Sequence, residues 1–274
     1  MSRAFCAVEN NDEPLAGTAP GDIQTWLGVE LSGAWQARAI HSEGINDALR
    51  DVLTTWQAAG GRRMQFLKQS IPVPPTVWFA EDGVLWSWPL TTAAELAEQL
   101  KAGPPPHATR HSKPVLWVCT HGKRDLCCAK WGLPVYRAMV EDGRIRTLQT
   151  SHLGGHRFAA TALELPAGLL YGRLSPDDMP TLATHITQGT LWLDRLRGRS
   201  ALSMAAQAAE IAVRQHTGDI DNSDVSAAED DGQVTVTLQG SEHAVRTEHI
   251  EGPTKLASCS GTMKASKRWV ATLR

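Results

Sequence analysis

Residues 115–140 have the sequence VLWVCTHGKRDLCCAKWGLPVYRAMV, in which an apolar run is followed by a polar loop and then by a helix-forming segment. The run Val115–Cys119 predicts a buried strand, and residues 128–140 predict a helix. A second strand is expected at residues 145–150. Strand, helix and strand in this order are typical of an α/β unit in which a helix covers a sheet.

The chain continues this unit with two further strands and a helix. The strands are expected at residues 162–165 and 169–173, separated by a Pro-Ala-Gly turn at 166–168. The helix begins at residues 175–178, where a serine N-cap is followed by proline and two acidic residues that favour a helix start. Its expected apolar face consists of Leu182, Ile186, Leu193 and Leu196.

The first hundred residues show the same order of elements. They predict a strand at residues 25–31, a helix at 45–59, strands at 62–69, 76–81 and 84–90, and a helix that begins at Thr92. Asp82-Gly83 is a strong hairpin signal, and Thr92 with Glu95 forms a capping box. Both halves therefore have the order strand, helix, strand, strand, strand, helix, which is expected of a thioredoxin-like unit.

A run of glycine and three prolines at residues 103–106 separates the two halves as a stiff linker. We expect an α/β protein of two thioredoxin-like halves, residues 1–103 and 110–200, each with a mixed sheet flanked by helices. Residues 201–274 are expected to form a small C-terminal α+β appendage. Its predicted elements are a helix at 201–216, an acidic loop at 218–232 and strands at 234–238, 244–250 and 268–273.

The composition is that of a folded protein with almost balanced charge. The 274 residues include 27 Lys+Arg and 29 Asp+Glu, a net charge of −2, and 42% are hydrophobic. These values argue against a disordered chain and against nucleic acid or an anionic membrane as partner. The first residues lack a signal-peptide pattern, and no apolar run approaches the roughly 18 residues of a membrane helix, so a cytoplasmic protein is expected.

The chemistry is expected in two loops that follow strands. Cys119 ends one predicted strand and Cys128 lies in the first turn of the next helix, where the helix dipole favours a thiolate. His152 and His156 follow the strand at 145–150, and Gly154 and Gly155 between them permit positive φ angles and a close approach of backbone N–H groups. Two adjacent loops would thus supply two sulfurs and two imidazoles to one site.

The ligand types leave more than one kind of site open. Zinc sites commonly space two cysteines by two to four residues, whereas eight residues separate Cys119 from Cys128. A [2Fe–2S] cluster of the Rieske type uses two Cys on one iron and two His on the other. From the residues alone, zinc and iron–sulfur are equally compatible, and a site without metal is the third interpretation.

Two long motifs resemble the sucrase/ferredoxin-like family. They are CTHGKRDLCCAKWGLPVY at residues 119–136 and QTSHLGGHRFAATALELPAGLLYGRL at 149–174, and the opening pieces Cys6, GTAP at 17–20 and WLGVE at 26–30 are also similar. The resemblance spans roughly residues 6–196. It implies a thioredoxin-like ferredoxin domain with a [2Fe–2S] cluster bound by Cys119, Cys128, His152 and His156.

The neighbouring residues are given supporting roles or none. Arg124 and Asp125 are expected to form an ion pair that braces the loop, and Arg124 or Arg157 would offset the negative charge of the cluster. Cys127 is expected to be a packing or spare thiol rather than a ligand, and His121 a loop residue or one that supports the ligands from behind. Cys6 and Cys259, far away in the sequence, are interpreted as thiols without a role.

The expected function is one-electron transfer to a redox partner protein, with a potential above the ~−400 mV of plant-type ferredoxins and roughly in the Rieske range. If the second ring nitrogen of His152 or His156 is exposed, it would take up a proton on reduction, and electron transfer would then be coupled to proton transfer. An electron carrier is favoured over a stand-alone enzyme. The alternatives are a thiol-disulfide oxidoreductase that uses Cys127 and Cys128, and a Cys2His2 zinc-stabilised interaction module.

Overall fold

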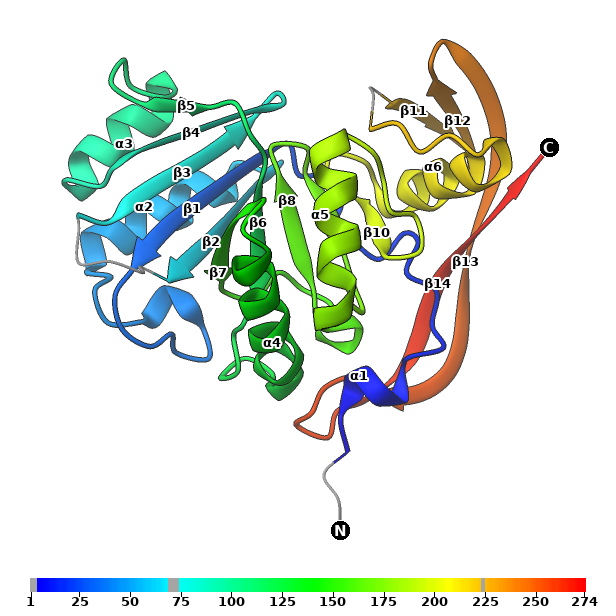
Figure 1. Cartoon of the computed structure of the whole chain (residues 1–274), viewed down its shortest axis with the longest axis horizontal. Coiled ribbons are helices and arrows are strands. Elements are labelled where there is room, and N and C mark those ends of the chain that lie inside the picture. The colour runs from blue at the N-terminus through cyan, green and yellow to red at the C-terminus, as the bar shows by residue number, and fades with distance from the viewer. Residues whose placement is uncertain (1–3, 69–73, 223–224) are drawn as a thin grey trace.

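One large sheet carries most of the protein. In the computed structural model the described residues are 4–68, 74–222 and 225–274. Ten strands form the large sheet in the order β10-β9-β8-β6-β7-β2-β1-β3-β4-β5, and a separate sheet has the order β11-β12-β13-β14. Figure 1 shows the helices α2 to α5 against the large sheet and α6 beside the small one. The expected α/β class is confirmed.

The first half of the large sheet begins with a parallel pair. Strand β1 (Thr25–Leu31) lies parallel to β2 (Arg62–Lys68), and helix α2 (Asp47–Ala58) connects them. Strand β3 (Thr76–Glu81) pairs antiparallel with the other side of β1, and β4 (Val84–Pro89) pairs with β3. Helix α3 (Ala93–Ala102) follows, and the Thr92 side chain accepts a hydrogen bond from the backbone N–H of Glu95 as the capping signal predicts.

The second half repeats these pairings. Strand β6 (Val115–Cys119) lies parallel to β7 (Arg146–Thr150) through helix α4 (Leu126–Asp142). Strand β8 (Ala162–Leu165) is antiparallel to β6, and β9 (Leu169–Tyr171) is antiparallel to β8. A 3-10 turn, η3 (Pro176–Asp178), and helix α5 (Met179–Gln188) complete this half.

The two halves share one sheet rather than forming two separate ones. Strand β2 pairs antiparallel with β7 at Leu67 and Thr150, which joins the edge of one half to the edge of the other. Two short strands that the sequence did not predict extend the outer edges: β5 (Thr109–His111) pairs with β4, and β10 (Leu196–Arg199) pairs with β9. Each half could have ended at its own free edge, and pairing the two satisfies backbone groups that an open edge leaves unpaired. The proposed domain boundaries at 103, 110 and 200 stay predictions.

Alternate residues of the strands face two different cores. Leu27 and Val29 of β1 pack under the helices of the first half, and Leu116 and Val118 of β6 pack under those of the second. The opposite faces of both halves contribute to one common core, which includes Trp26, Trp78, Trp117, Leu67 and Leu163. A Cβ atom on Gly28 would lie 2.6 Å from the Trp117 ring, so glycine is required where the halves meet.

The C-terminal segment forms a helix and a sheet that reach across the molecule. Helix α6 (Met204–Thr217) packs on β12 (Gln233–Leu238), β13 (Ser241–Leu256) and β14 (Met263–Leu273). The predicted strands are thus present, but β13 and β14 are much longer than expected. They form a hairpin that runs down one side of the molecule toward the short helix α1 (Cys6–Glu9) (Figure 1).

Two further sequence expectations differ from the structure. Helix α5 ends at Gln188 because Gly189 adopts a left-handed conformation, so Leu193 leaves the helix and Leu196 enters β10. Strand β11 (Val225–Asp230) lies inside the segment expected to be an acidic loop, and pairs with β12 at the edge of the small sheet.

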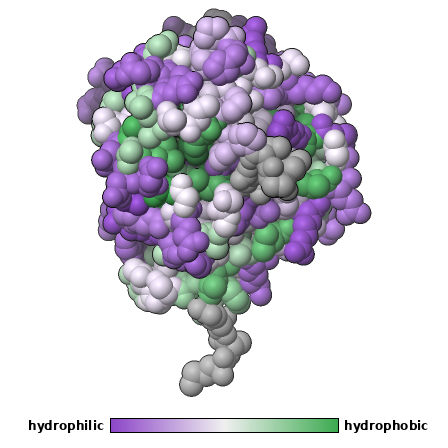
Figure 2. All heavy atoms as spheres, turned by 90° about the vertical axis from the view of Figure 1, so that its left-hand side faces the viewer, coloured by the Kyte–Doolittle hydropathy of each residue, from purple (hydrophilic) through white to green (hydrophobic). Residues whose placement is uncertain are grey.

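Among the described residues, no helix is both long enough and apolar enough to span a membrane. Figure 2 shows the face on the left of Figure 1, where hydrophilic side chains surround hydrophobic ones near the middle.

Candidate metal centre

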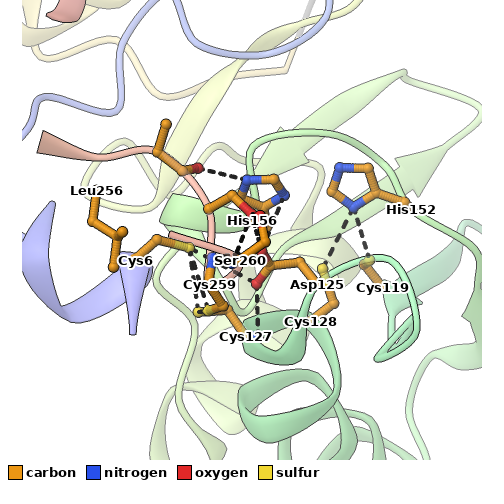
Figure 3. A network of polar contacts seen from close by, with 12 residues as sticks. Cys6, Cys119, Asp125, Cys127, Cys128, His152, His156, Leu256, Cys259 and Ser260 are labelled. Carbon is orange, nitrogen blue, oxygen red and sulfur yellow. Dashed lines mark hydrogen bonds and ion pairs between the residues drawn. The ribbon is translucent and has the colours of Figure 1, made fainter. Parts of the chain in front are cut away.

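Three of the four predicted ligands meet at the end of β6. Cys119 is the last residue of β6, Cys128 lies in the first turn of α4, and His152 lies in the loop after β7. The His152 Nδ1 atom is 3.4 Å from the Cys128 sulfur and 3.9 Å from the Cys119 sulfur. All three ligand atoms lie within 4.8 Å of one another, and both cysteines are buried (Figure 3).

Local sequence brings α4 and β6 close enough for this contact. A Cβ atom on Gly132 of α4 would lie 2.0 Å from the Cys119 carbonyl oxygen, which no side chain tolerates. At the start of the helix, the Asp125 carboxylate accepts a hydrogen bond from the Cys127 backbone N–H and so caps α4. Gly132 and Asp125 thus fix the position and the starting point of the helix that carries Cys128.

The thiolate is favoured at Cys119, not at Cys128 as the helix-dipole argument predicts. A hydrogen bond from the Cys128 thiol, opposed by burial and supported by His152, holds the pKa of Cys119 well below its usual value. The pKa of Cys128 is raised because its thiol donates that hydrogen bond and is buried. The hydrogen bond between the two sulfurs therefore favours one negative charge on Cys119.

The fourth predicted ligand, His156, lies beside the group. Its ring stacks on the His152 ring with centroids 5.2 Å apart and an angle of 27° between the planes. Its Nε2 atom is 2.7 Å from the Ala257 carbonyl oxygen, and its Nδ1 atom is 3.8 Å from an Asp125 carboxylate oxygen. Gly154 and Gly155 have φ angles of 97° and 72°, which confirms the expected positive values.

Cys119, Cys128 and His152 can hold a metal, and His156 lies beside them with one free ring nitrogen. The two buried sulfurs lie on one side and the two stacked imidazoles on the other (Figure 3). The His156 Nδ1 atom is buried without a hydrogen-bond partner, while Nε2 is positioned to donate to a backbone carbonyl. Histidine ligands commonly donate the second ring N–H in this way, which leaves the other nitrogen for a metal.

A basic cavity gives access to His152. Its volume is about 450 Å³, and in the described part of the chain its lining includes four arginines and no acidic side chain. The charged and imidazole residues of the lining are Arg38, Arg62, Arg63, Arg124, His121 and His152. The first half of the protein supplies Arg38, Arg62 and Arg63, so this half forms one wall above the ligands of the second half.

The sequence of residues 15–198 matches the model of the sucrase/ferredoxin-like family. The chain belongs to this family.

The chain is also similar to two individual proteins. Over 92 residues the chain is 30% identical to "Altered inheritance of mitochondria protein 32" of Meyerozyma guilliermondii, which covers 30% of this chain and 33% of the yeast protein. A thioredoxin-like [2Fe-2S] ferredoxin from Aquifex aeolicus is similar over 31% of this chain and 91% of its own, with 16% identity and a TM-score of 0.28. The chain thus spans about a third of the length of the curated relative.

The expected supporting residues of this sucrase/ferredoxin-like protein have other partners. Asp125 does not pair with Arg124; it contacts Cys127, Cys259 and Ser258 instead, because its carboxylate points into the protein. Arg124 lines the basic cavity. Arg157 forms an ion pair with Glu13 at 2.9 Å, which connects the N-terminal segment to the histidine loop. The charge of Arg157 is thus paired with Glu13.

Sequence reasoning missed one buried and one half-buried cation near the site. The guanidinium of Arg197 is fully buried, contacts the carbonyl oxygens of Thr18 and Gly154, and has no ion-pair partner among the described residues. Burial lowers its pKa to about 9, and the charge of Cys119 opposes that shift. Arg63 donates to the Leu153 carbonyl at 2.9 Å, and burial lowers its pKa as well. A buried cation without a carboxylate partner is costly unless a negative charge lies nearby, and no local sequence pattern marks these two arginines.

His121, expected to be a loop residue, connects the two halves. It is buried, its Nε2 atom is 2.8 Å from the Gln36 carbonyl oxygen, and its ring packs against Trp35. The loop with Cys119 is thus held from the first half of the protein.

Proposed function

We propose that this protein is a one-electron carrier with a [2Fe–2S] cluster bound by Cys119, Cys128, His152 and His156. The observation that carries the proposal is the convergence of the two buried sulfurs with His152 Nδ1, with the His156 ring stacked alongside. Two thiolates and two neutral imidazoles are the ligand set of a Rieske-type centre. When bound, the cluster supplies the redox step by accepting and releasing one electron.

The residues around the ligands favour the extra negative charge that an electron brings. Arg197 is a buried cation and Arg63 a half-buried one, neither has a described carboxylate partner, and both lie against the loop that carries the histidines. In the low-dielectric interior a nearby negative charge stabilises them strongly. They therefore support reduction and raise the potential above that of a site without them.

Proton transfer is assigned to the cavity side of the site. His152 lies on the wall of the basic cavity, so water in the cavity can reach its ring. Reduction raises the proton affinity of an exposed imidazole ligand, and the electron is then coupled to a proton. His156 is held by the Ala257 carbonyl and serves to orient the site.

The redox partner is expected to present an acidic surface. The overall charge of −2 does not steer partners over a long range, whereas the arginines around the cavity create a local positive field. A cytoplasmic location and a non-enzymatic carrier role remain part of this proposal.

The positions of Cys127 and Cys128 argue against the oxidoreductase alternative. Cys128 faces His152, whereas Cys127 faces Cys6 and Cys259, so the two adjacent thiols belong to different groups (Figure 3). A dithiol exchange reaction requires its two sulfurs to form a disulfide with each other.

Anaerobic purification of the full chain tests the proposal. A coloured protein with about two iron and two acid-labile sulfide per chain is expected from the cluster stoichiometry. The variant Cys119→Ser should lose most of the iron. His152→Cys and His156→Cys should keep a cluster with a changed spectrum and a lower potential, while the control His185→Gln, on α5, should match the parent protein.

A colourless parent protein with one zinc at Cys119, Cys128 and His152 would contradict the proposal and support the zinc-stabilised module instead. The proton coupling has its own test, since the potential should fall with rising pH by up to about 59 mV per unit. A potential that stays constant from about pH 6 to 10 would disprove the proton coupling. Unchanged spectra in both histidine variants would show that His152 and His156 are not ligands.

A further inference from the structure

A second group of sulfurs lies on the other side of Asp125. The Cys6 sulfur is 3.4 Å from the Cys127 sulfur and 3.7 Å from the Cys259 sulfur, and the last two are 3.1 Å apart. They come from α1, from the first turn of α4 and from the loop between β13 and β14. Figure 3 shows these three sulfurs gathered to one side of Asp125, with Cys119, Cys128 and His152 on the other.

The Asp125 carboxylate completes this group. Its ligand oxygen and the three sulfurs all lie within 4.8 Å of one another. One carboxylate oxygen accepts from the Cys127 backbone N–H at 2.9 Å and lies 3.8 Å from the Cys6 sulfur, and the other accepts from the Cys259 backbone N–H at 3.0 Å. These hydrogen bonds fix the carboxylate and, at the same time, the two backbone segments that carry Cys127 and Cys259.

We propose that Cys6, Cys127, Cys259 and Asp125 bind one zinc ion in a closed, structural site. Zinc takes four ligands in tetrahedral geometry with Zn–S distances of about 2.3 Å, which separates its sulfur ligands by about 3.8 Å. The observed separations of 3.1–3.7 Å need only a small outward movement to meet this value. On binding, the three thiols release their protons to solvent and the thiolates coordinate the ion.

Three sulfurs in mutual contact fit a metal better than a disulfide. A disulfide uses two of them and leaves the third thiol buried beside it without a partner. Cys6 and Cys127 are completely buried, and Cys259 is partly buried. Buried thiols whose sulfurs all point at one another, with a carboxylate within reach, are the donor set of a structural cation site.

The zinc site would be separate from the proposed cluster, and it would fix the loop that contacts His156. Ala257, whose carbonyl contacts His156, lies two residues from Cys259 in the same loop. α1, the start of α4 and the hairpin loop meet around these three sulfurs, at positions up to 253 residues apart in sequence. A zinc ion would therefore attach the β13–β14 hairpin to the second half of the protein, which carries the predicted cluster ligands.

Metal analysis of the full chain and of paired variants tests this inference. The parent protein, produced with zinc in the medium and purified without oxygen, should contain about one zinc per chain. Cys259→Ser, a partly buried position in a loop, should lose the zinc and keep its iron. Ser260→Ala in the same loop is the matched control and should retain both metals.

A reciprocal variant distinguishes the two metal sites experimentally. Cys119→Ser should keep its zinc whatever happens to its iron, so the zinc site can be judged even if the proposed cluster is absent. Titration of the metal-free Cys119→Ser protein with Co²⁺ should give sulfur-to-cobalt charge-transfer absorption, which Cys259→Ser in the same background should lack.

Three results would overturn the inference. These are zinc that persists in Cys259→Ser, zinc that disappears in Cys119→Ser, and a native Cys127–Cys259 disulfide found by mass spectrometry in the anaerobic protein. Cys6→Ser serves as a second, independent variant for the same readout.

Discussion

At the scale of single residues, Asp125 has a larger role than a loop brace. Burial raises the pKa of its carboxyl, but hydrogen bonds from Cys259 and from the Cys127 backbone outweigh burial and lower it to about 2. The ionised carboxylate caps α4, faces His156 and completes the second sulfur group. One side chain therefore lies between both proposed metal sites.

A buried acid in β8 predicts how stability depends on pH. Burial raises the pKa of Glu164 to about 7, although the Tyr171 hydroxyl donates to it at 3.1 Å. Between about pH 4.5 and 7 the folded chain holds a proton that the unfolded chain has lost, so stability falls as pH rises through this window. The loss is on the order of 3 kcal/mol.

Urea unfolding at several pH values checks this effect. Glu164→Gln keeps an acceptor for Tyr171 but cannot ionise, so the stability of the parent relative to this variant should fall as pH rises from 4.5 to 7. A difference between the two proteins that stays constant over this range would show that Glu164 is already ionised in the fold.

At the scale of elements, the approach of α4 to β6 controls the site. Gly132→Ala places a Cβ atom 2.0 Å from the Cys119 carbonyl oxygen, so the helix must move away and carry Cys128 with it. Overpacking of this kind costs about 1–3 kcal/mol. We expect a lower melting temperature and a several-fold lower iron content in the purified variant.

Arg137→Ala, an exposed change on the same helix, is the matched control and should keep both properties. If Gly132→Ala retains full iron content while losing stability, α4 does not set the distance between the two cysteines.

At the scale of the whole molecule, the joined sheet places the arginines of one half over the ligands of the other. Electron exchange with the anionic acceptor ferricyanide should therefore slow about tenfold at low salt in the Arg38→Glu/Arg124→Glu variant, because the local field is reversed. The difference should shrink at high salt, where screening is strong. Stopped-flow absorbance of the reduced protein measures these rates.

Arg110→Glu/Arg137→Glu carries the same change in net charge, and neither residue lines the cavity. Equal slowing in this control would mean that net charge, rather than the basic cavity, steers the acceptor.

The parts of the fold with strong local patterns were predictable from the sequence. The alternating and helical patterns marked most strands and helices of both halves, and the capping residues of α3 and the hairpin at Asp82-Gly83 marked their ends. The strands β5, β10 and β11 were missed because Thr109–His111, Leu196–Arg199 and Val225–Asp230 are short or polar. Edge strands of this kind form because a neighbouring strand offers hydrogen bonds, and that information is not local.

The candidate site was likewise predictable from the sequence only in part. Cys119, Cys128, His152 and His156 could be proposed from sequence because the ends of neighbouring strands lie close together in an α/β fold, and the structure brings the first three together with His156 alongside. Only the tertiary structure placed Cys6 and Cys259 beside Cys127 and buried Arg197 behind the histidine loop. The sulfur contacts join residues more than a hundred positions apart, and Arg197 contacts Gly154 across 43 positions. These contacts depend on how the hairpin, the N-terminal segment and β10 pack, which no spacing within a single element encodes.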